Sequence, residues 1–242
     1  MAPKKKIEAC LICGEPLVYY ETAREMTCVR CGGTFRSNAA CEAGHYVCDA
    51  CHGKQAVENI LSYCAGCSLR DPIAIAKALM ADPFVHMHGP EHHVLVGAAL
   101  LTAYRNSGGA VDLEPALAEL ARRGEQVPGG ACGFWGCCGA AVSAGIFFSV
   151  AAGATPMAGE SWGLANRATA AALQAIGEIG GPRCCKRDAF TAILRAADLC
   201  RQELGVSMDT PEKVVCGFFP RNRECLGPRC PYHPAEAGSA GN

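Results

Sequence analysis

Pairs of cysteines separated by two residues constrain this chain more than any other feature of its sequence. There are 18 cysteines in 242 residues, and most of those in the first third have Cys-x-x-Cys spacing, which is typical of metal ligands. In a small secreted chain so many cysteines would indicate disulfides. The opening residues, MAPKKKIEAC, lack the apolar core of a signal peptide. We therefore expect metal-bound thiolates in a cytoplasmic, reducing setting.

The first four cysteines predict a zinc-ribbon site. Cys10-x2-Cys13 and Cys28-x2-Cys31 are separated by fourteen residues. Four thiolates around zinc form a closed tetrahedral site, which is structural and not catalytic. These four residues are the expected ligands of the first zinc ion.

A second zinc site is predicted by the cysteines that follow. Two further Cys-x-x-Cys pairs supply four thiolates, and a cysteine and a histidine upstream of them are spare ligands. The two pairs are Cys48 with Cys51 and Cys64 with Cys67, and the spare ligands are Cys41 and His45. An alternative that omits Cys28 and Cys31 fits the cross-braced spacing of a RING finger. It leaves a complete Cys-x-x-Cys pair unexplained, and nothing downstream indicates ubiquitin chemistry.

The rest of the sequence predicts helices. The chain is 50% hydrophobic and 19% charged, which is enough for a sizeable core. Asp71-Pro72 is a good helix start, and an apolar helix is expected from Pro90 to Gly108. Asp188 is expected to cap the last helix. Residues 126–159 carry no Asp, Glu, Lys or Arg, and without a cationic flank they predict a buried central helix, not a membrane span.

The expected fold is therefore mostly α, with a small zinc-ribbon-like module containing short β-hairpins before the helical domain. The predicted divisions are the module at 1–67, the helical domain at 68–205 and a cysteine-containing tail at 206–242. The tail is expected to be disordered from Ala235.

Three motifs in the helical part combine cysteine, histidine and cations: HMHGPEHH, GGACGFWGCCGAA and PRCCKR. Helix starts keep histidine rings neutral, and helix starts and cations lower thiol pKa values. The expected catalytic groups are Cys137, Cys138, Cys184, Cys185, His92 and His93. The expected cofactor-binding groups are Cys132, His88, Lys186 and Arg187. The alternative is that these residues only pack the core or cap helices.

The tail adds three further cysteines, Cys216, Cys225 and Cys230, the last of which precedes Pro231. A Cys-Pro step after spaced cysteines is found in iron–sulfur proteins. A third zinc site fits the same residues, so both possibilities stay open.

At MHGPEHHVLVGAALL, PGGACGFWGCCGAA and PRCCKR the chain resembles an uncharacterised domain-of-unknown-function family found largely in anaerobic microbes. The resemblance covers Cys10 to His233. It implies a cysteine-rich ribbon followed by a helical domain, sometimes associated with SAM-dependent methyltransferases. This sequence has no Gly-rich SAM-binding loop after a strand, so methyltransferase activity is not implied.

These features together predict a metal-binding protein, with an oxygen-sensitive redox or sulfur-chemistry enzyme as the leading hypothesis. Its Cys/His site would hold an iron–sulfur cluster or another soft metal beside one or two structural zinc ions. Lys186 and Arg187 would bind a small anionic substrate. The alternative is a regulatory or adaptor protein whose ribbon binds nucleic acid or a protein partner, with the helical domain sensing a metal or thiol-reactive ligand. The net charge of −1 disfavours nucleic acid, and no membrane is expected.

Overall fold

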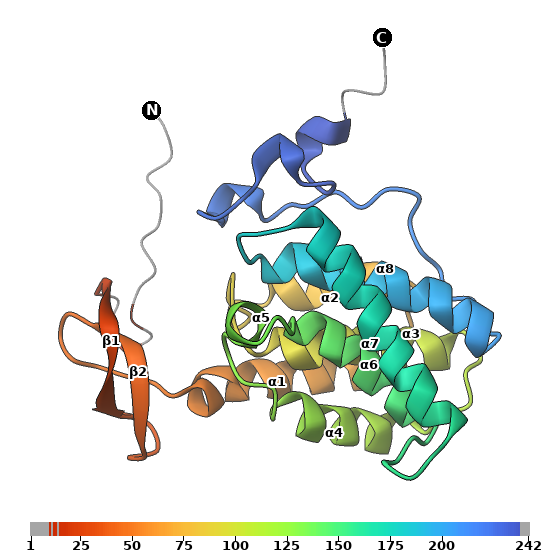
Figure 1. Cartoon of the computed structure of the whole chain (residues 1–242), viewed down its shortest axis with the longest axis horizontal. Helices are drawn as coiled ribbons and strands as arrows, with labels where there is room; N and C mark the ends of the chain where they lie inside the picture. Colours follow the sequence, from red (N-terminus) through yellow and green to blue (C-terminus); the bar gives the residue numbers. More distant parts are fainter. Residues whose placement is uncertain (1–9, 11, 14, 238–242) are drawn as a thin grey trace. The chain divides into compact units, whose positions relative to one another are not determined.

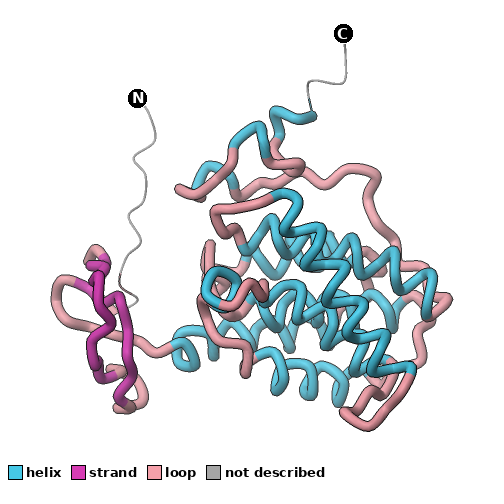
Figure 2. The backbone as a smooth tube through the Cα atoms, in the orientation of Figure 1, coloured by secondary structure: helices cyan, strands magenta, loops and turns pink. Residues whose placement is uncertain are grey.

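The computed structural model describes residues 10, 12–13 and 15–237, and it forms two compact units, Met1–Gln55 and Ala56–Asn242. The division falls before the expected boundary at residue 67, because α1 (Asp49–Gly66) begins in the first unit and ends in the second. The predicted class, a mostly helical chain with a small N-terminal β-module, is confirmed (Figures 1 and 2).

The first unit is built on one antiparallel hairpin. β1 (Leu17–Thr27) pairs with β2 (Thr34–Cys41), with a register shift between Tyr19 and Arg24. Leu17 lies opposite Cys41 and Thr27 opposite Thr34. The residues before β1 and after β2 therefore lie at one end of the hairpin, and the connecting turn lies at the other.

The second unit is a helical bundle around a buried pair of helices, α3 and α6. Its helices are α2 (Pro72–Ala81), α3 (His92–Asn106), α4 (Leu113–Gly124), α5 (Ala131–Phe134), α6 (Gly139–Ala151), α7 (Glu160–Ile179) and α8 (Cys185–Glu203). α3 contacts α2, α4, α6 and α8, and α6 contacts α3, α4, α7 and α8. Both were predicted to be buried because they are apolar almost all round, and this is confirmed. Among the described residues, no helix is long and apolar enough to cross a membrane.

Small side chains let the two central helices approach closely. A Cβ atom at Gly97 on α3 would collide with Leu120 and with the carbonyl of Ser143 on α6. Instead the backbone N–H of Gly97 donates to the Ser143 hydroxyl at 2.9 Å. The backbone of α3 therefore packs directly against α6.

Helix starts agree with the sequence at α2 and differ at α8. The Asp71 carboxylate accepts hydrogen bonds from the backbone N–H groups of Ile73 and Ala74 at 2.8 and 3.1 Å, as predicted for an N-cap. The expected cap at Asp188 is wrong. α8 begins at Cys185, and the Cys184 sulfur accepts from the Arg187 N–H at 3.5 Å. Asp188 is in the first turn and is buried there.

The C-terminal tail returns to the helical bundle through three short 3-10 turns, Phe219–Arg221, Gly227–Arg229 and Pro234–Ala237. The Tyr232 hydroxyl bonds to the Thr191 hydroxyl of α8 at 2.9 Å. Disorder was expected from Ala235, yet residues up to Ala237 form a turn, and residues 238–242 lie outside the described part.

Candidate metal centres

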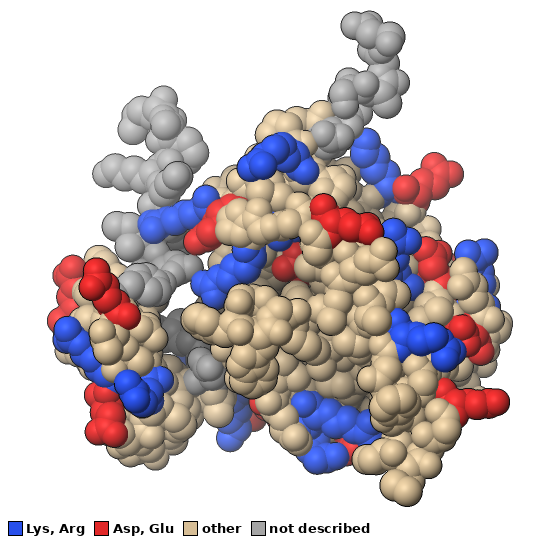
Figure 3. Space-filling view, in the orientation of Figure 1, with Lys and Arg blue, Asp and Glu red and all other residues tan. Residues whose placement is uncertain are grey.

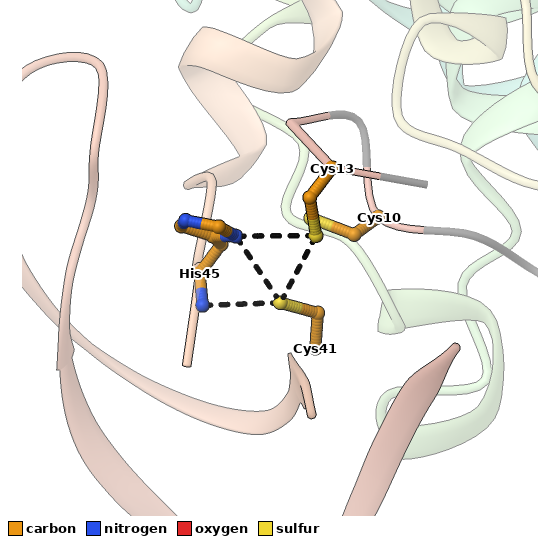
Figure 4. Close-up of side chains that lie close together, drawn as sticks. All are labelled: Cys10, Cys13, Cys41 and His45. Atoms are coloured by element: carbon orange, nitrogen blue, oxygen red, sulfur yellow. Dashed lines mark hydrogen bonds between the residues drawn. The ribbon is translucent and has the colours of Figure 1, made fainter. Parts of the chain in front are cut away.

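The N-terminal unit contains two groups of ligand atoms with metal-binding geometry. The first joins Cys10, Cys13, Cys41 and His45, whose ligand atoms all lie within 4.8 Å of one another. The His45 Nδ1 atom is 3.3 Å from the Cys13 sulfur and 3.4 Å from the Cys41 sulfur, and these sulfurs are 3.9 Å apart. Figure 4 shows the four side chains pointing toward a common centre.

The second group joins Cys28, Cys31, Cys48 and Cys51 within the same limit of 4.8 Å. The sulfurs of Cys31 and Cys48 are 3.8 Å apart. The backbone N–H of Cys48 donates to the Cys28 sulfur at 3.3 Å. Each group offers four ligands in a closed arrangement, which is the pattern of structural metal sites.

The ligand sets correct the sequence prediction, because the first and second Cys-x-x-Cys pairs do not share a metal. β1 contains 11 residues, and at about 3.3 Å per residue a strand of that length extends over roughly 30 Å. Cys10 and Cys13 precede the strand, whereas Cys28 and Cys31 follow it. The antiparallel register brings Cys41, at the end of β2, beside the first pair. A β-bridge between Cys28 and Tyr46 then brings the segment after β2 beside the second pair. The module is therefore cross-braced.

Cys64 and Cys67 do not belong to the second group, contrary to prediction. Cys64 is fully buried in the helical core, and burial raises the pKa of its thiol to about 12. Cys67 packs against the same core. The RING alternative included these two residues and left out Cys28 and Cys31, so its ligand set is also wrong, although its cross-braced topology is present.

Backbone N–H groups favour the thiolate form of the first cysteine in each group. Burial raises the pKa of Cys28, but the backbone N–H groups of Cys48, Cys31 and Arg30 outweigh it and lower the value to about 6. At Cys10 burial is likewise outweighed by the N–H groups of Cys13 and Ile12, and the pKa falls to about 7. Thiolates are the form that binds metal.

The helical unit brings together four other cysteines, one from the start of α8 and three from the tail. Cys184, Cys216, Cys225 and Cys230 line one small hollow that is partly open to solvent. Cys184 and Cys230 are buried, and Cys216 and Cys225 are half-buried. The predicted tail ligands are thus joined by Cys184, which was expected in a different group.

All four sulfurs accept hydrogen bonds from N–H groups. In the tail the donor is the backbone N–H two residues further on: Phe218 to Cys216 at 3.4 Å and Gly227 to Cys225 at 3.4 Å, and the Tyr232 backbone to Cys230. Ile12 donates to Cys10 in the same way at 3.4 Å in the first N-terminal group. The tail cysteines therefore have the local geometry of the metal ligands in the N-terminal module.

Cations and a polar side chain surround this hollow. Lys186 and Arg187 line it. The Lys186 ammonium lies 5.2 Å from the centre of the Phe218 ring. The Asn222 amide donates to the Cys184 sulfur at 3.3 Å, while its oxygen lies 3.2 Å from Nε2 of His88. Asn222 thus links a predicted cofactor-binding histidine to a thiol, although no sequence motif marked it.

The spacing of the four sulfurs is too wide for a single ion. Among the described residues, only the two N-terminal groups place three or more ligand atoms within 4.8 Å of one another. A tetrahedral zinc ion holds its sulfurs about 2.3 Å from the metal and therefore close together. A cluster holds its thiolates farther apart, because they bind different iron atoms.

The other predicted catalytic residues do not all line the same hollow. Cys132 and Cys138 line a second hollow, whereas Cys184 lines the first, and Cys137 lines neither. The His93 ring donates from Nδ1 to the Val127 carbonyl at 2.9 Å. Parts of the three motifs do lie side by side, since Cys138 donates to Asp188 at 3.8 Å and a Cβ atom on Gly139 would meet the His93 ring. A single site that uses all of the predicted residues stays a prediction.

The His92 side chain forms part of a buried cluster of charged groups. Its Nδ1 donates to the Gly89 carbonyl at 3.2 Å, and its Nε2 accepts from the Lys186 ammonium at 3.1 Å. Burial, reinforced by Lys186, lowers its pKa to about 3. Glu91 lies beside it, 1% exposed, and although burial raises the carboxyl pKa, His86 and His92 bring it down to about 2. This network orients Lys186, which also donates to the His86 carbonyl at 2.8 Å.

The structure disagrees with the prediction of acidic thiols at Cys138, Cys184 and Cys185. Burial, followed by the Asp188 carboxylate, raises the pKa of Cys138 to about 12, and burial raises that of Cys185 to about 12. Burial raises the pKa of Cys184 to about 11, despite the N–H of Arg187. Desolvation outweighs the helix start and the cations. A metal at Cys184 would have to displace its proton.

Comparison with known proteins gives one match. The model of a family of unknown function, DUF5714, matches residues 60–233. No curated protein and no solved structure matches the chain. The match begins after the cross-braced module and contains all four cysteines of the first hollow. The expected resemblance to an uncharacterised family is thereby confirmed, and the link to anaerobic microbes and methyltransferases stays a prediction.

Proposed function

Since the chain belongs to DUF5714, a family of unknown function, we propose a function from its own geometry. The protein is an iron–sulfur redox protein whose N-terminal module is held together by two structural zinc ions. The observation that carries this proposal is the set of four cysteines around one hollow, Cys184, Cys216, Cys225 and Cys230.

Zinc is the metal that best suits the N-terminal module. One group has three cysteines and a histidine, and the other has four cysteines. Both sets are common structural zinc sites. All four positions around each metal would be taken by protein ligands, so no position is left for a substrate. The module has little apolar core of its own and gains its stability from the metals.

Iron suits the four-cysteine hollow better than zinc for two reasons. The sulfurs do not approach one another as the N-terminal ligands do. Each also accepts an N–H bond, and hydrogen bonds to the sulfurs are one of the means by which proteins set the potential of a cluster. The Lys186 ammonium lines the hollow and partly balances the negative charge of the thiolates.

The cluster would supply one-electron transfer, and the protein residues would control its stability and its access to solvent. Met87, Phe218 and Leu226 line the hollow with apolar surface and exclude water. Asn222 fixes the Cys184 sulfur and is itself held by His88. Lys186 favours the reduced, more negative state, and its position is fixed by His92 and the His86 carbonyl.

Anaerobic purification tests this proposal. The chain should contain iron and acid-labile sulfide in equal amounts, with a broad visible absorption and an EPR signal on one-electron reduction or oxidation. Cys225→Ser should lose most of the iron, because serine is a poor ligand for a cluster. Cys137→Ser is the matched control, since Cys137 is equally half-buried but lines neither hollow, and it should keep the iron. Iron that is retained in Cys225→Ser and lost in Cys137→Ser would reject this ligand set.

We propose a second role for the cross-braced module, the binding of a protein partner. An apolar residue is exposed within the first pair of each metal group, Ile12 at 44% and Val29 at 49%. Residues 15–55 contain four Lys or Arg and five Asp or Glu, which disfavours nucleic acid. Figure 3 shows cations and acids interspersed on the visible face of the helical unit as well.

Affinity purification of the tagged chain from its own cells tests this role. Val29→Glu should release a protein that co-purifies with the wild type while zinc content stays the same, because Val29 lies between two ligands but binds no metal. Co-purifying nucleic acid that is lost at high salt would contradict the proposal, as would a protein partner that Val29→Glu leaves bound.

A further inference from the structure

A second hollow in the helical unit adjoins the hollow of the four cysteines at Arg187. It is a cavity of about 370 Å³ that opens to solvent, and its wall comes from the segment around α5, the end of α7 and the start of α8. Arg187 lines both hollows. Ligand sites of this size are typical of small organic molecules. We call this hollow the α7–α8 cleft.

Five glycines give the α7–α8 cleft its shape. They are Gly133, Gly136, Gly177, Gly180 and Gly181. A Cβ atom built on any of them would meet no protein atom within 4 Å. The wall is therefore bare backbone facing open space, and a ligand can approach it closely.

Gly177 is the most informative of these residues, because neither packing nor backbone conformation requires it. Gly136 and Gly180 have φ values of 63° and 79°, which favour glycine whatever lies nearby. Gly177 is inside α7 and has no positive φ. Glycine within a helix is less favourable than alanine.

The chemistry of the wall indicates the kind of ligand. Arg183 lines the cleft and is exposed, with no ion-pair partner among the described residues. The Arg187 guanidinium donates from Nε to the Asp188 carboxylate at 2.9 Å, so that its charge is largely balanced. Leu173 and Ile176 supply apolar surface. Arg183 is therefore the group that can bind an acid.

We propose that the α7–α8 cleft binds a small organic anion, with its acid group on Arg183 and its apolar body against Leu173 and Ile176. The bare backbone at Gly177 leaves room for that body. The Cys138 thiol donates to Asp188 at 3.8 Å at the same wall.

Binding of a matched acid and amide tests the cleft with the full-length, anaerobically purified chain. The probes are 4-phenylbutyrate and the neutral 4-phenylbutyramide, followed by titration calorimetry or ligand-detected NMR. The acid should bind about tenfold more tightly than the amide, because a charge-assisted hydrogen bond to Arg183 is added. Arg183→Gln should abolish this preference and leave amide binding unchanged.

A pair of glycine variants separates ligand space from helix stability. Gly177→Leu should lose binding of both probes while the thermal midpoint stays the same or rises, because leucine favours a helix more than glycine does. Gly163→Leu on the same helix is the control. A Cβ there meets only the flexible end of Arg167 at 3.4 Å, and Gly163 does not line the cleft, so binding should persist.

The outcomes distinguish this proposal from the proposed function. Equal affinity for the acid and the amide, or binding that survives Gly177→Leu, would overturn the proposal that the α7–α8 cleft binds an organic anion. This holds whether or not the sample contains iron. Acid-selective binding in a chain without iron supports the cleft and rejects the cluster. Probe binding and iron content are measured on the same preparation.

Discussion

Asn222 provides the sharpest test of how the protein would control the four-cysteine site. Its amide donates to the Cys184 sulfur at 3.3 Å, and its oxygen accepts from the Glu224 N–H at 3.1 Å and faces His88 Nε2 at 3.2 Å. Asn222→Asp keeps the acceptor that Glu224 and His88 use. It removes the donor to sulfur and adds a negative charge. Both changes disfavour the more negative, reduced cluster, so the reduction potential should fall.

The size of the shift follows from two contributions. A hydrogen bond to a charged group is worth about 1.5–3 kcal/mol, and about half of that, roughly 1 kcal/mol, should differ between the redox states. For one electron this is about 40 mV. Two charges about 7 Å apart interact by about 2 kcal/mol at an effective dielectric constant near 20. Solvent around the half-buried Asn222 screens roughly half of this, which adds about 40 mV. The expected total is about −80 mV.

Potentiometric titration followed by EPR measures this shift, with iron content determined on the same samples. Asn222→Ala should move the potential by about −40 mV, since the donor is lost without an added charge. Asn166→Asp is the control, because Asn166 is exposed on α7 and lines neither hollow, and its potential should not change. An unchanged or higher potential in Asn222→Asp would refute the assignment of Cys184 as a ligand.

Three further predictions concern the modules. Cys48→Ala should release about one zinc ion per chain. Cys64→Ala should keep all of the zinc and lower the unfolding free energy of the helical unit by about 1–2 kcal/mol, because Cys64 is a core residue. Equal zinc contents of the two variants by elemental analysis would contradict the cross-braced ligand sets. Removing iron with a chelator should speed amide hydrogen exchange in residues 206–237, since the cluster would tie the tail to α8; unchanged exchange would count against this. The pKa of His92 is lowered from 6.5 to about 3 in the folded chain. As the pH falls below about 6.5, the unfolded chain therefore binds a proton at His92 that the folded chain does not bind. The unfolding free energy should fall between about pH 6.5 and 3, by up to about 1.4 kcal/mol per pH unit. His92→Gln should flatten this slope in denaturant titrations between pH 6.5 and 4, and an unaltered slope would show that the ring is not held neutral.

The sequence identifies the N-terminal ligands but not their partners. Spacing alone predicts that Cys10, Cys13, Cys28 and Cys31 are metal ligands. Which pairs share a metal depends on the hairpin between them, whose 11-residue first strand separates the two pairs. The Cys-x3-His pair at Cys41 was the available signal, because a third pair between the second and fourth is typical of alternating, cross-braced ligation.

Helices were easier to predict than the sites that they position. Caps such as Asp71 and apolar stretches such as α3 are local features, and the structure confirms them. The joining of Cys184 to the tail cysteines is a long-range contact that no local pattern encodes. The raised thiol pKa values of Cys138 and Cys185 were missed for a related reason, since burial depends on the whole fold and outweighs the local effect of a helix start.

The ratio of zinc to iron in the anaerobically purified chain, combined with X-ray absorption at both metal edges, tests the central claim most directly. We expect about two zinc ions per chain, one with three sulfurs and a nitrogen and one with four sulfurs. We also expect iron bound by sulfur with a second iron nearby. About three zinc ions and no iron would contradict this claim, because the cysteines at 184, 216, 225 and 230 would then hold a single ion.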